Sequence, residues 1–172
     1  MSVVELTDAL LSSVDKPARY IGGELNSVNK AITPEMVRVA FAFPDVYEVG
    51  MSHLGMQILY HFFNRREDVF CERVFAPWTD MEAEMRKARL PLFALETHTP
   101  VREFDFLAFT LQYEMSYTNV LAMLKLSNIP LLREERAEDA PIIVAGGPCA
   151  FNPEPLAEVI DAFVVGDGEE QI

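Results

Sequence analysis

Short runs of hydrophobic residues alternate along the chain with segments whose hydrophobic residues recur at helical spacing. The runs are rich in β-branched and aromatic residues and predict strands, over residues 37–43, 69–75, 92–95, 104–111, 141–145 and 162–165. They carry few polar residues, as expected of parallel strands that are buried on both faces. Strands that alternate with helices predict a mostly parallel sheet.

Four segments have the apolar spacing of amphipathic helices. The first covers residues 3–14, and the second follows Ser52, which can cap it. The third opens with Thr79 and Glu82, which form a capping box in which each side chain would satisfy a free backbone amide. The fourth follows Ser116, a second candidate cap. With these helices, the chain is predicted to be an α/β protein whose mostly parallel sheet is covered on both faces.

The first part of the chain has a different character. Residues 15–34 contain two prolines and two adjacent glycines, Gly22 and Gly23, and have no long apolar run. A connection of this length is usually either functional or poorly ordered. We therefore predict an N-terminal helix and extended linker over residues 1–34, and an α/β domain over residues 35–172.

Composition narrows the class of protein. Hydrophobic residues make up 50% of the chain, which is enough for a sizeable core, and the net charge of −13 disfavours binding to nucleic acid. No apolar stretch is long enough to span a membrane, and no secretory signal opens the chain. Cys71 and Cys149 are too few for a disulfide framework and have no metal-ligand spacing with the three histidines. These features predict a cytoplasmic protein without a metal site.

Glycine-rich and polar segments follow four of the predicted strands, at residues 44–55, 110–119, 146–155 and 166–170. In a parallel sheet these loops share one edge, where open parallel sheets bind ligands. Their glycines would let a ligand approach the backbone closely. Each loop taken alone is also compatible with an ordinary tight turn, and the fingerprints of dinucleotide-binding and phosphate-binding loops are absent.

Taken together, several motifs resemble those of a known family. PDVYEVGMSHLG at 44–55, ERVFAPWTD at 72–80, LQYEMSYTN at 111–119 and AGGPCAFNPEP at 145–155 resemble the N-terminal part of an uncharacterised family of cobalamin-binding-domain radical S-adenosylmethionine (radical SAM) proteins. VVGDGEE at 164–170 resembles the Gly-Glu-Gly-Glu segment that closes this domain in many such enzymes. The resemblance runs from about Arg19 to the last residue.

The resemblance implies a cobalamin-binding, flavodoxin-like version of the Rossmann-like fold, with possible cobalamin binding at the carboxyl edge of the sheet. The loops after the fourth and fifth predicted strands resemble segments that embrace the nucleotide tail of cobalamin; they contribute Thr110, Leu111, Gln112, Gly146, Gly147 and Pro148. The remaining candidate cofactor-binding residues are Ser52, His53, Gly55, Gly166 and Gly168. A valine at position 147 is expected to abolish binding. No catalytic residue is predicted.

The family resemblance also implies a partner. In such proteins a C-terminal radical SAM barrel carries three cysteines, spaced Cys-x3-Cys-x2-Cys, for a 4Fe–4S cluster that cleaves S-adenosylmethionine reductively to a carbon radical. This chain has no such triad. The cluster and S-adenosylmethionine are therefore assigned to a missing barrel of a parent enzyme, and the chain is interpreted as a truncated, non-catalytic domain whose partner is that barrel.

One motif departs from the family pattern. The established cobalamin motif is Asp-x-His-x-x-Gly, in which the histidine ligates cobalt. Here Met51 stands in place of the aspartate, and Gly55 comes one residue early. Two functions therefore stay open, a module that holds cobalamin next to the barrel and a cofactor-free docking domain that covers the radical site. A flavin- or nucleotide-binding domain is a third, weaker reading of the same strand ends.

Overall fold

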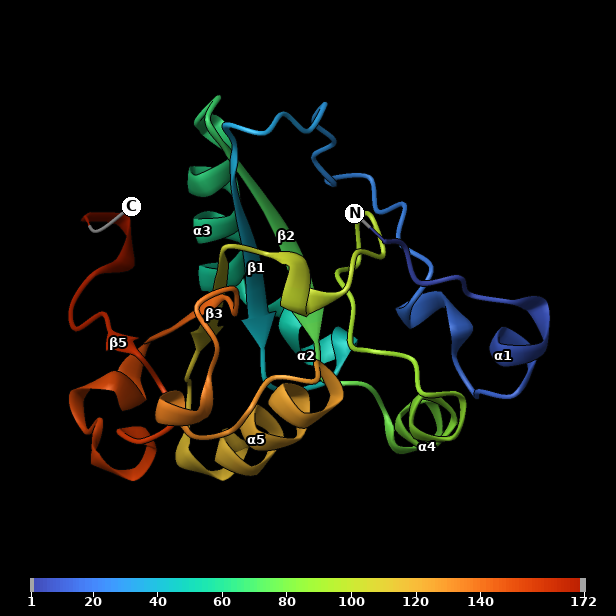
Figure 1. Cartoon of the computed structure of the whole chain (residues 1–172). Helices are drawn as coiled ribbons and strands as arrows, with labels where there is room; N and C mark the ends of the chain where they lie inside the picture. Colours follow the sequence, from blue (N-terminus) through green and yellow to red (C-terminus); the bar gives the residue numbers. More distant parts are fainter. Residues whose placement is uncertain (1, 171–172) are drawn as a thin grey trace.

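The computed structural model describes residues 2–170 and contains one parallel sheet in the order β2-β1-β3-β4-β5 (Figure 1). The strands are β1 (Val37–Phe43), β2 (Val69–Phe75), β3 (Phe106–Thr110), β4 (Ile142–Gly146) and β5 (Ala162–Phe163). All four strand pairs are parallel. This confirms the predicted α/β, Rossmann-like fold. The strand order is that of the flavodoxin-like doubly wound sheets.

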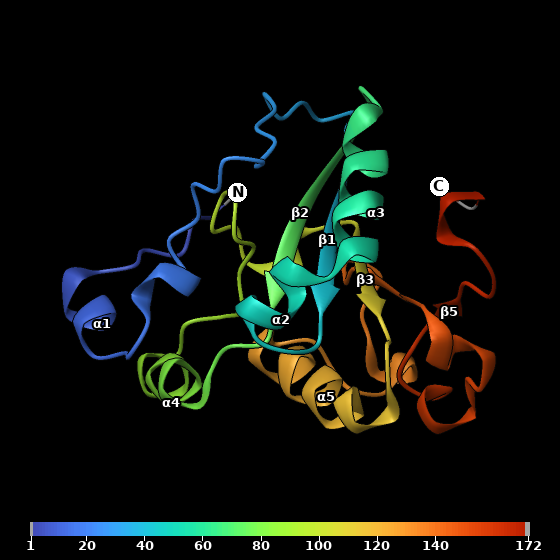
Figure 2. The same cartoon turned by 180° about the vertical axis from the view of Figure 1, so that it is seen from behind.

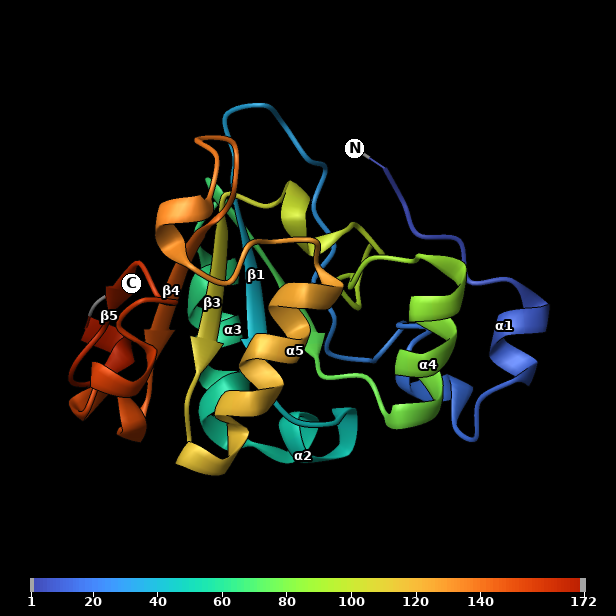
Figure 3. The same ribbon diagram turned by 60° about the horizontal axis from the view of Figure 1, so that its bottom comes forward.

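Helices lie on both faces of the sheet (Figures 2 and 3). The α-helices are α1 (Asp8–Ser12), α2 (Tyr47–Ser52), α3 (Leu54–Arg65), α4 (Thr79–Ala88) and α5 (Tyr117–Leu126). Short 3-10 helices are η1 (Pro17–Arg19), η2 (Val101–Glu103), η3 (Glu114–Ser116), η4 (Arg133–Glu135), η5 (Pro148–Phe151), η6 (Glu154–Leu156) and η7 (Gly168–Glu170). Helix α3 packs on one face, and α4 and α5 pack on the other.

The sheet divides the apolar interior into two clusters because successive strand residues point to opposite faces. On the α3 face, Val39 and Phe41 of β1 pack against Met56 and Tyr60. On the other face, a larger cluster joins the sheet to α4 and α5, and it also includes Val4, Leu10, Val14 and Tyr20 of the N-terminal segment. These four residues pack the N-terminal segment against the face that α4 and α5 cover.

The strand predicted at residues 92–95 is wrong. Pro91 and Pro100 bracket this segment, and Phe93 makes only an isolated antiparallel bridge to Pro100. Between them the backbone turns sharply at His98, whose φ is 55°. Proline cannot donate to a ladder and favours strand edges and turns, so the apolar run becomes a compact turn beside β2. The other predicted strands are present, with ends shifted by at most two residues.

The predicted helix caps also need correction. Ser52 ends α2 instead of opening α3, and its hydroxyl donates to Val49 O. Thr79 lies inside the first turn of α4, after Trp78 at the N-cap position, so the predicted capping box does not form. Ser116 stands at the N-cap position of α5, but its hydroxyl donates to Tyr113 O and caps no amide. The Ser52 and Ser116 hydroxyls thus bond to preceding carbonyls, a local bond that competes with capping. The Thr79 hydroxyl makes no cap hydrogen bond.

The predicted N-terminal helix is shorter than its apolar spacing suggests. The helix α1 covers five residues within the predicted range 3–14, and Thr7 caps it by accepting from Leu10 N. No helix in the described part of the chain is long and apolar enough to cross a membrane.

Candidate cofactor-binding groove

A groove of about 480 Å³ opens on the α3 face of the sheet. One wall is α3, the floor is formed by β1, β3 and β4, and the other wall is the segment that follows β5. Its volume lies within the range of roughly 300–1,000 Å³ that is usual for small-molecule sites. The groove therefore has the size of a ligand site.

The floor of the groove is apolar. It consists of alternate residues of the central strands, including Val39, Phe41, Phe106, Ala108 and Val144. Phe106, Ala108 and Val144 are only half-buried, although they belong to inner strands of the sheet. This part of the sheet therefore presents apolar surface that no described residue covers.

Polar and glycine residues gather at the carboxyl end of the groove. Those that line it and were predicted from the sequence are His53, Gly55, Thr110, Gln112, Gly146, Gly147, Gly166 and Gly168. They come from the loops after β1, β3, β4 and β5. The parallel topology brings these four loops to one edge, as the strand pattern implies.

Three predicted site residues do not line the groove. Leu111 is fully buried in the larger core cluster, and its backbone joins two loops, since its N–H donates to Gly146 O and its O accepts from Cys149 N. Ser52 is exposed at the end of α2, and Pro148 is exposed at the start of η5. Leu111 thus supports the loops structurally.

His53 occupies the turn between α2 and α3. Its Nδ1 accepts a hydrogen bond from Met56 N at 3.2 Å and so caps α3, and its ring packs against Phe43 with centroids 5.2 Å apart. A neutral imidazole that accepts at Nδ1 carries its proton on Nε2. Ligation of cobalt through Nε2 would need a lone pair on this nitrogen instead of the proton. The arrangement therefore favours hydrogen-bond donation by His53 over cobalt ligation.

The two adjacent glycines after β4 have different structural roles. Gly147 has a φ of 96°, and a Cβ there would stand 2.8 Å from Leu111 O. The fold itself therefore requires glycine at this position, and Gly147→Val is a poor test of ligand binding. A Cβ on Gly146 would meet nothing closer than 3.7 Å, at Val164 O. A side chain at position 146 is compatible with the backbone and would occupy the groove.

Thr110 and Gln112 form the polar pair at this end. The Gln112 side-chain amide donates to Thr110 Oγ1 at 2.6 Å, and Thr110 is buried. This leaves the amide oxygen of Gln112 and one amide hydrogen for a ligand. Cys149 lies nearby on η5, but burial raises the pKa of its thiol, so it is not activated as a nucleophile. Among the described residues, no His, Cys, Asp and Glu side chains cluster to hold a metal ion.

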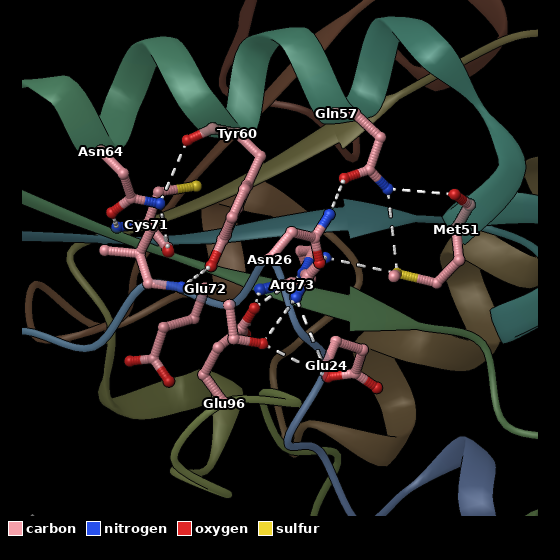
Figure 4. A network of polar contacts seen from close by, with 12 residues as sticks. Glu24, Asn26, Met51, Gln57, Tyr60, Asn64, Cys71, Glu72, Arg73 and Glu96 are labelled. Carbon is pink, nitrogen blue, oxygen red and sulfur yellow. Dashed lines mark hydrogen bonds and ion pairs between the residues drawn. The ribbon is translucent and has the colours of Figure 1, made fainter.

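A buried polar network lies on the opposite flank of α3, around Arg73 of β2 (Figure 4). The Arg73 side chain is fully buried, and its Nε donates to Glu96 Oε1 at 2.7 Å. Its Nη2 donates to Ser27 Oγ at 2.9 Å, and its Nη1 to Asn26 Oδ1 at 3.3 Å. The guanidinium lies 4.4 Å from the centre of the Tyr60 ring. Arg73 thus ties the N-terminal linker to the sheet.

The network also reaches the turn that carries His53. Gln57 Oε1 accepts from Asn26 Nδ2 at 3.1 Å, and Gln57 Nε2 donates to Met51 O at 3.0 Å. The sequence-based reasoning missed Arg73. The signal that could have found it is the Glu72-Arg73 pair inside an otherwise apolar strand, because buried charges are almost always paired.

Fold and groove together define a Rossmann-like domain with a ligand-sized site at the carboxyl ends of its strands. The family model described as "Radical SAM proteins, N-terminal" matches residues 55–172. The chain therefore belongs to this family of N-terminal regions of radical SAM proteins. The family match confirms the radical SAM part of the sequence-based interpretation, while cobalamin binding stays a prediction.

An uncharacterised protein of Methanocaldococcus jannaschii is 29% identical to this chain over 132 residues. The match covers 76% of this chain and 24% of that protein, so the chain spans about a quarter of the length of the curated relative it matches. No solved structure matches the chain.

Proposed function

We propose that this domain binds cobalamin at the carboxyl end of the groove and holds it beside a radical SAM barrel that follows in a longer parent protein. One observation carries the proposal. The candidate cofactor-binding residues come from four separate segments, and eight of them line a single cavity. The polar end and apolar floor of that cavity are the combination typical of cofactor sites.

The lining suggests a role for each contact. Gly146 would let the nucleotide tail approach the backbone, and Thr110 and Gln112 would offer it hydrogen bonds. His53 would donate from Nε2, since its Nδ1 is occupied by Met56 N. When bound, cobalamin would supply a cobalt centre that carries electrons or an alkyl group, while the protein supplies binding and orientation.

A cofactor-free docking domain is the second candidate, and one observation favours it. Large apolar side chains are exposed on the loops at the carboxyl edge of the sheet: Val49, Leu54, Trp78, Tyr113, Met115, Phe151 and Val165. Exposed apolar residues that gather at one edge mark an interaction surface. This edge would face the barrel in either case, so the two candidates differ only in whether cobalamin is bound.

Binding of hydroxocobalamin by the unmodified chain separates the two candidates, and Gly146→Val tests the proposed place of binding. The valine would fill the carboxyl end of the groove without a backbone clash, so affinity for hydroxocobalamin should fall at least about tenfold, or ~1.4 kcal/mol. The measurement is a titration followed by visible absorption and calorimetry. Unfolding by urea should show that the fold persists.

Val37→Phe is the matched control, since it adds bulk at the opposite, amino end of the groove and should leave cobalamin affinity unchanged. The titration is repeated with the unmodified 172-residue chain and with the longer protein. If neither binds hydroxocobalamin, the result favours the docking domain.

A further inference from the structure

The two faces of the sheet are covered unequally. The crossover from β1 to β2 passes through α3 and moves toward one edge of the sheet, whereas those from β3 to β4 and from β4 to β5 move toward the other edge. Since crossovers between parallel strands are right-handed, connections that move in opposite directions lie on opposite faces. Among the described residues, no α-helix therefore covers β3, β4 and β5 on the face that carries α3 (Figure 2).

The amino half of this bare face shows exposed apolar side chains of the sheet, beside the exposed ion pair of Arg66 and Asp68. Ile142 is 48% exposed and Val37 is 36% exposed. The half-buried Phe106 lies between them, as the β3 neighbour of Ile142 in the register. All-parallel sheets occur almost only with both faces covered by helices. An inner strand that shows apolar side chains to solvent thus marks a missing neighbour.

The last described residues run toward this surface. Beyond β5 the chain turns back, and Gly168 and Glu169 form part of the groove wall. Gly168 lies so close to α3 that a Cβ there would stand 3.1 Å from Leu59 Cδ2. Figure 1 shows this segment rising beside the sheet toward the amino ends of the strands. The last described segment, η7, therefore lies beside the uncovered face.

We propose that the polypeptide following residue 172 in the longer protein lays an amphipathic helix over the amino ends of β1, β3 and β4, with its apolar stripe on Val37 and Phe106 of the groove and on Ile142 beside it. The inference rests on the part of the proposed function that places further sequence after this chain. It does not depend on cobalamin. The relative of which this chain matches only 24% has ample sequence for such a helix.

The helix and the ligand would lie at different positions along the strands. The seven residues of β1 extend about 20 Å at roughly 3.3 Å per residue, and a helix is about 10 Å across. A helix that crosses at Val37 and Phe106 leaves the carboxyl end, around Thr110 and Gly146, open to a ligand. The helix would also pack over Val144 of the groove floor, which is only half-buried in the 172-residue chain.

Cysteine labelling tests this covering directly. Ile142→Cys and Leu25→Cys are made in the 172-residue chain and in the longer protein, and their rates of reaction with a small thiol reagent are measured without cobalamin. Leu25 is fully exposed outside the groove and is the control. The native Cys71 and Cys149 are buried, and chains without the added cysteine provide the blank.

The proposal expects Ile142→Cys to react at least about tenfold more slowly in the longer protein than in the 172-residue chain, with Leu25→Cys reacting equally in both. Equal rates for Ile142→Cys would overturn it. Protection that appears in the 172-residue chain as its concentration rises would also overturn it, because the occupant would then be a second copy.

Ile142→Asp gives an independent reading. The charge should lower the unfolding midpoint of the longer protein, where the site is covered, and leave that of the 172-residue chain unchanged. An equal effect in both chains would contradict the proposal. Because neither assay contains cobalamin, a failure of cobalamin binding and a failure of this inference give separate results.

Discussion

The two ends of the sheet are completed in different ways. At the β2 end, side chains and a neighbouring loop satisfy the outward backbone groups of the edge strand: Lys30 Nζ donates to Val69 O, Asn64 pairs with both backbone groups of Cys71, Glu96 accepts from Arg73 N, and Leu95 N donates to Arg73 O. At the β5 end, the edge strand has only two residues, and the face beside it is open.

This difference distinguishes the β2 end, where the edge strand is covered, from the β5 end, which lies beside the groove. An edge strand is a liability unless it is short, charged or covered. The chain covers β2 with Lys30 of the linker, Asn64 of α3 and the turn that holds Leu95 and Glu96, and it shortens β5 to two residues. The groove and its apolar floor lie on the other side of α3, over β1, β3 and β4. The β2 end is therefore closed by hydrogen bonds, and the β5 end is where the proposed ligand and helix would bind.

Arg73→Met should have the largest effect, and it tests whether the β2 end depends on buried charge. The change leaves Glu96 buried without its partner, and breaking a buried pair in this way typically costs about 3–5 kcal/mol. Urea unfolding followed by circular dichroism measures the loss.

Arg66→Met is the matched control, because its pair with Asp68 is exposed and its removal should leave stability unchanged. If Arg73→Met were as stable as the parent, the β2 end would be held by apolar packing alone, and the contrast between the two ends would lose its basis.

Tyr60→Phe should have a smaller effect at the same end. The Tyr60 hydroxyl accepts from Val28 N at 2.8 Å and anchors the linker. Its loss should cost about 1 kcal/mol, the usual net value of one hydrogen bond. Hydrogen exchange should show faster exchange at the Val28 amide.

Tyr113→Phe removes an exposed hydroxyl that lies 3.3 Å from Asp45 and should change neither stability nor exchange at Val28. Exchange at Val28 that stays slow in Tyr60→Phe would mean that Arg73 and Lys30 hold the linker without this bond.

The sequence predicted the sheet because its signal is local. An uninterrupted run such as residues 37–43 can be buried on both faces only in the interior of a parallel sheet. The shorter run at 92–95 is also apolar, but Pro91 and Pro100 on either side divert it into a turn. Composition alone does not show which of two similar runs finds a strand partner.

The candidate site was predictable in part for a related reason. Loops after parallel strands meet at one edge whatever their sequences, so His53, Thr110 and Gly146 could be grouped without coordinates. The close approach of Leu111 O to Gly147, which leaves no space for a Cβ, could not be predicted from the sequence. The network around Arg73 could not be predicted either. Both depend on distances between segments far apart in the chain, which no local pattern encodes.

Glu48→Gln should have the smallest effect, and it tests the outer contacts of the N-terminal segment. Glu48 of α2 accepts from Arg19 Nε at 3.0 Å and from Lys16 Nζ at 3.2 Å. The hydrogen bond from Arg19 is the main reason that the pKa of Glu48 falls to about 2. Since its side chain is 44% exposed, solvent screening limits the contribution to less than about 1 kcal/mol.

The sign of the pH dependence follows from that depressed pKa. The ionised carboxylate is favoured in the folded state, so its contribution is complete above the ordinary pKa of 4.5 and is lost as the pH falls toward about 2. The parent should therefore unfold at a slightly higher temperature than Glu48→Gln at pH 7, and the difference should vanish near pH 2. Asp139→Asn removes an exposed carboxylate 3.7 Å from Arg102 and should show no such convergence. If the difference in unfolding temperature between the parent and Glu48→Gln persists at low pH, packing and not the charge of Glu48 holds α2. The charged contacts that stabilise the β2 end would then extend no further than Arg73.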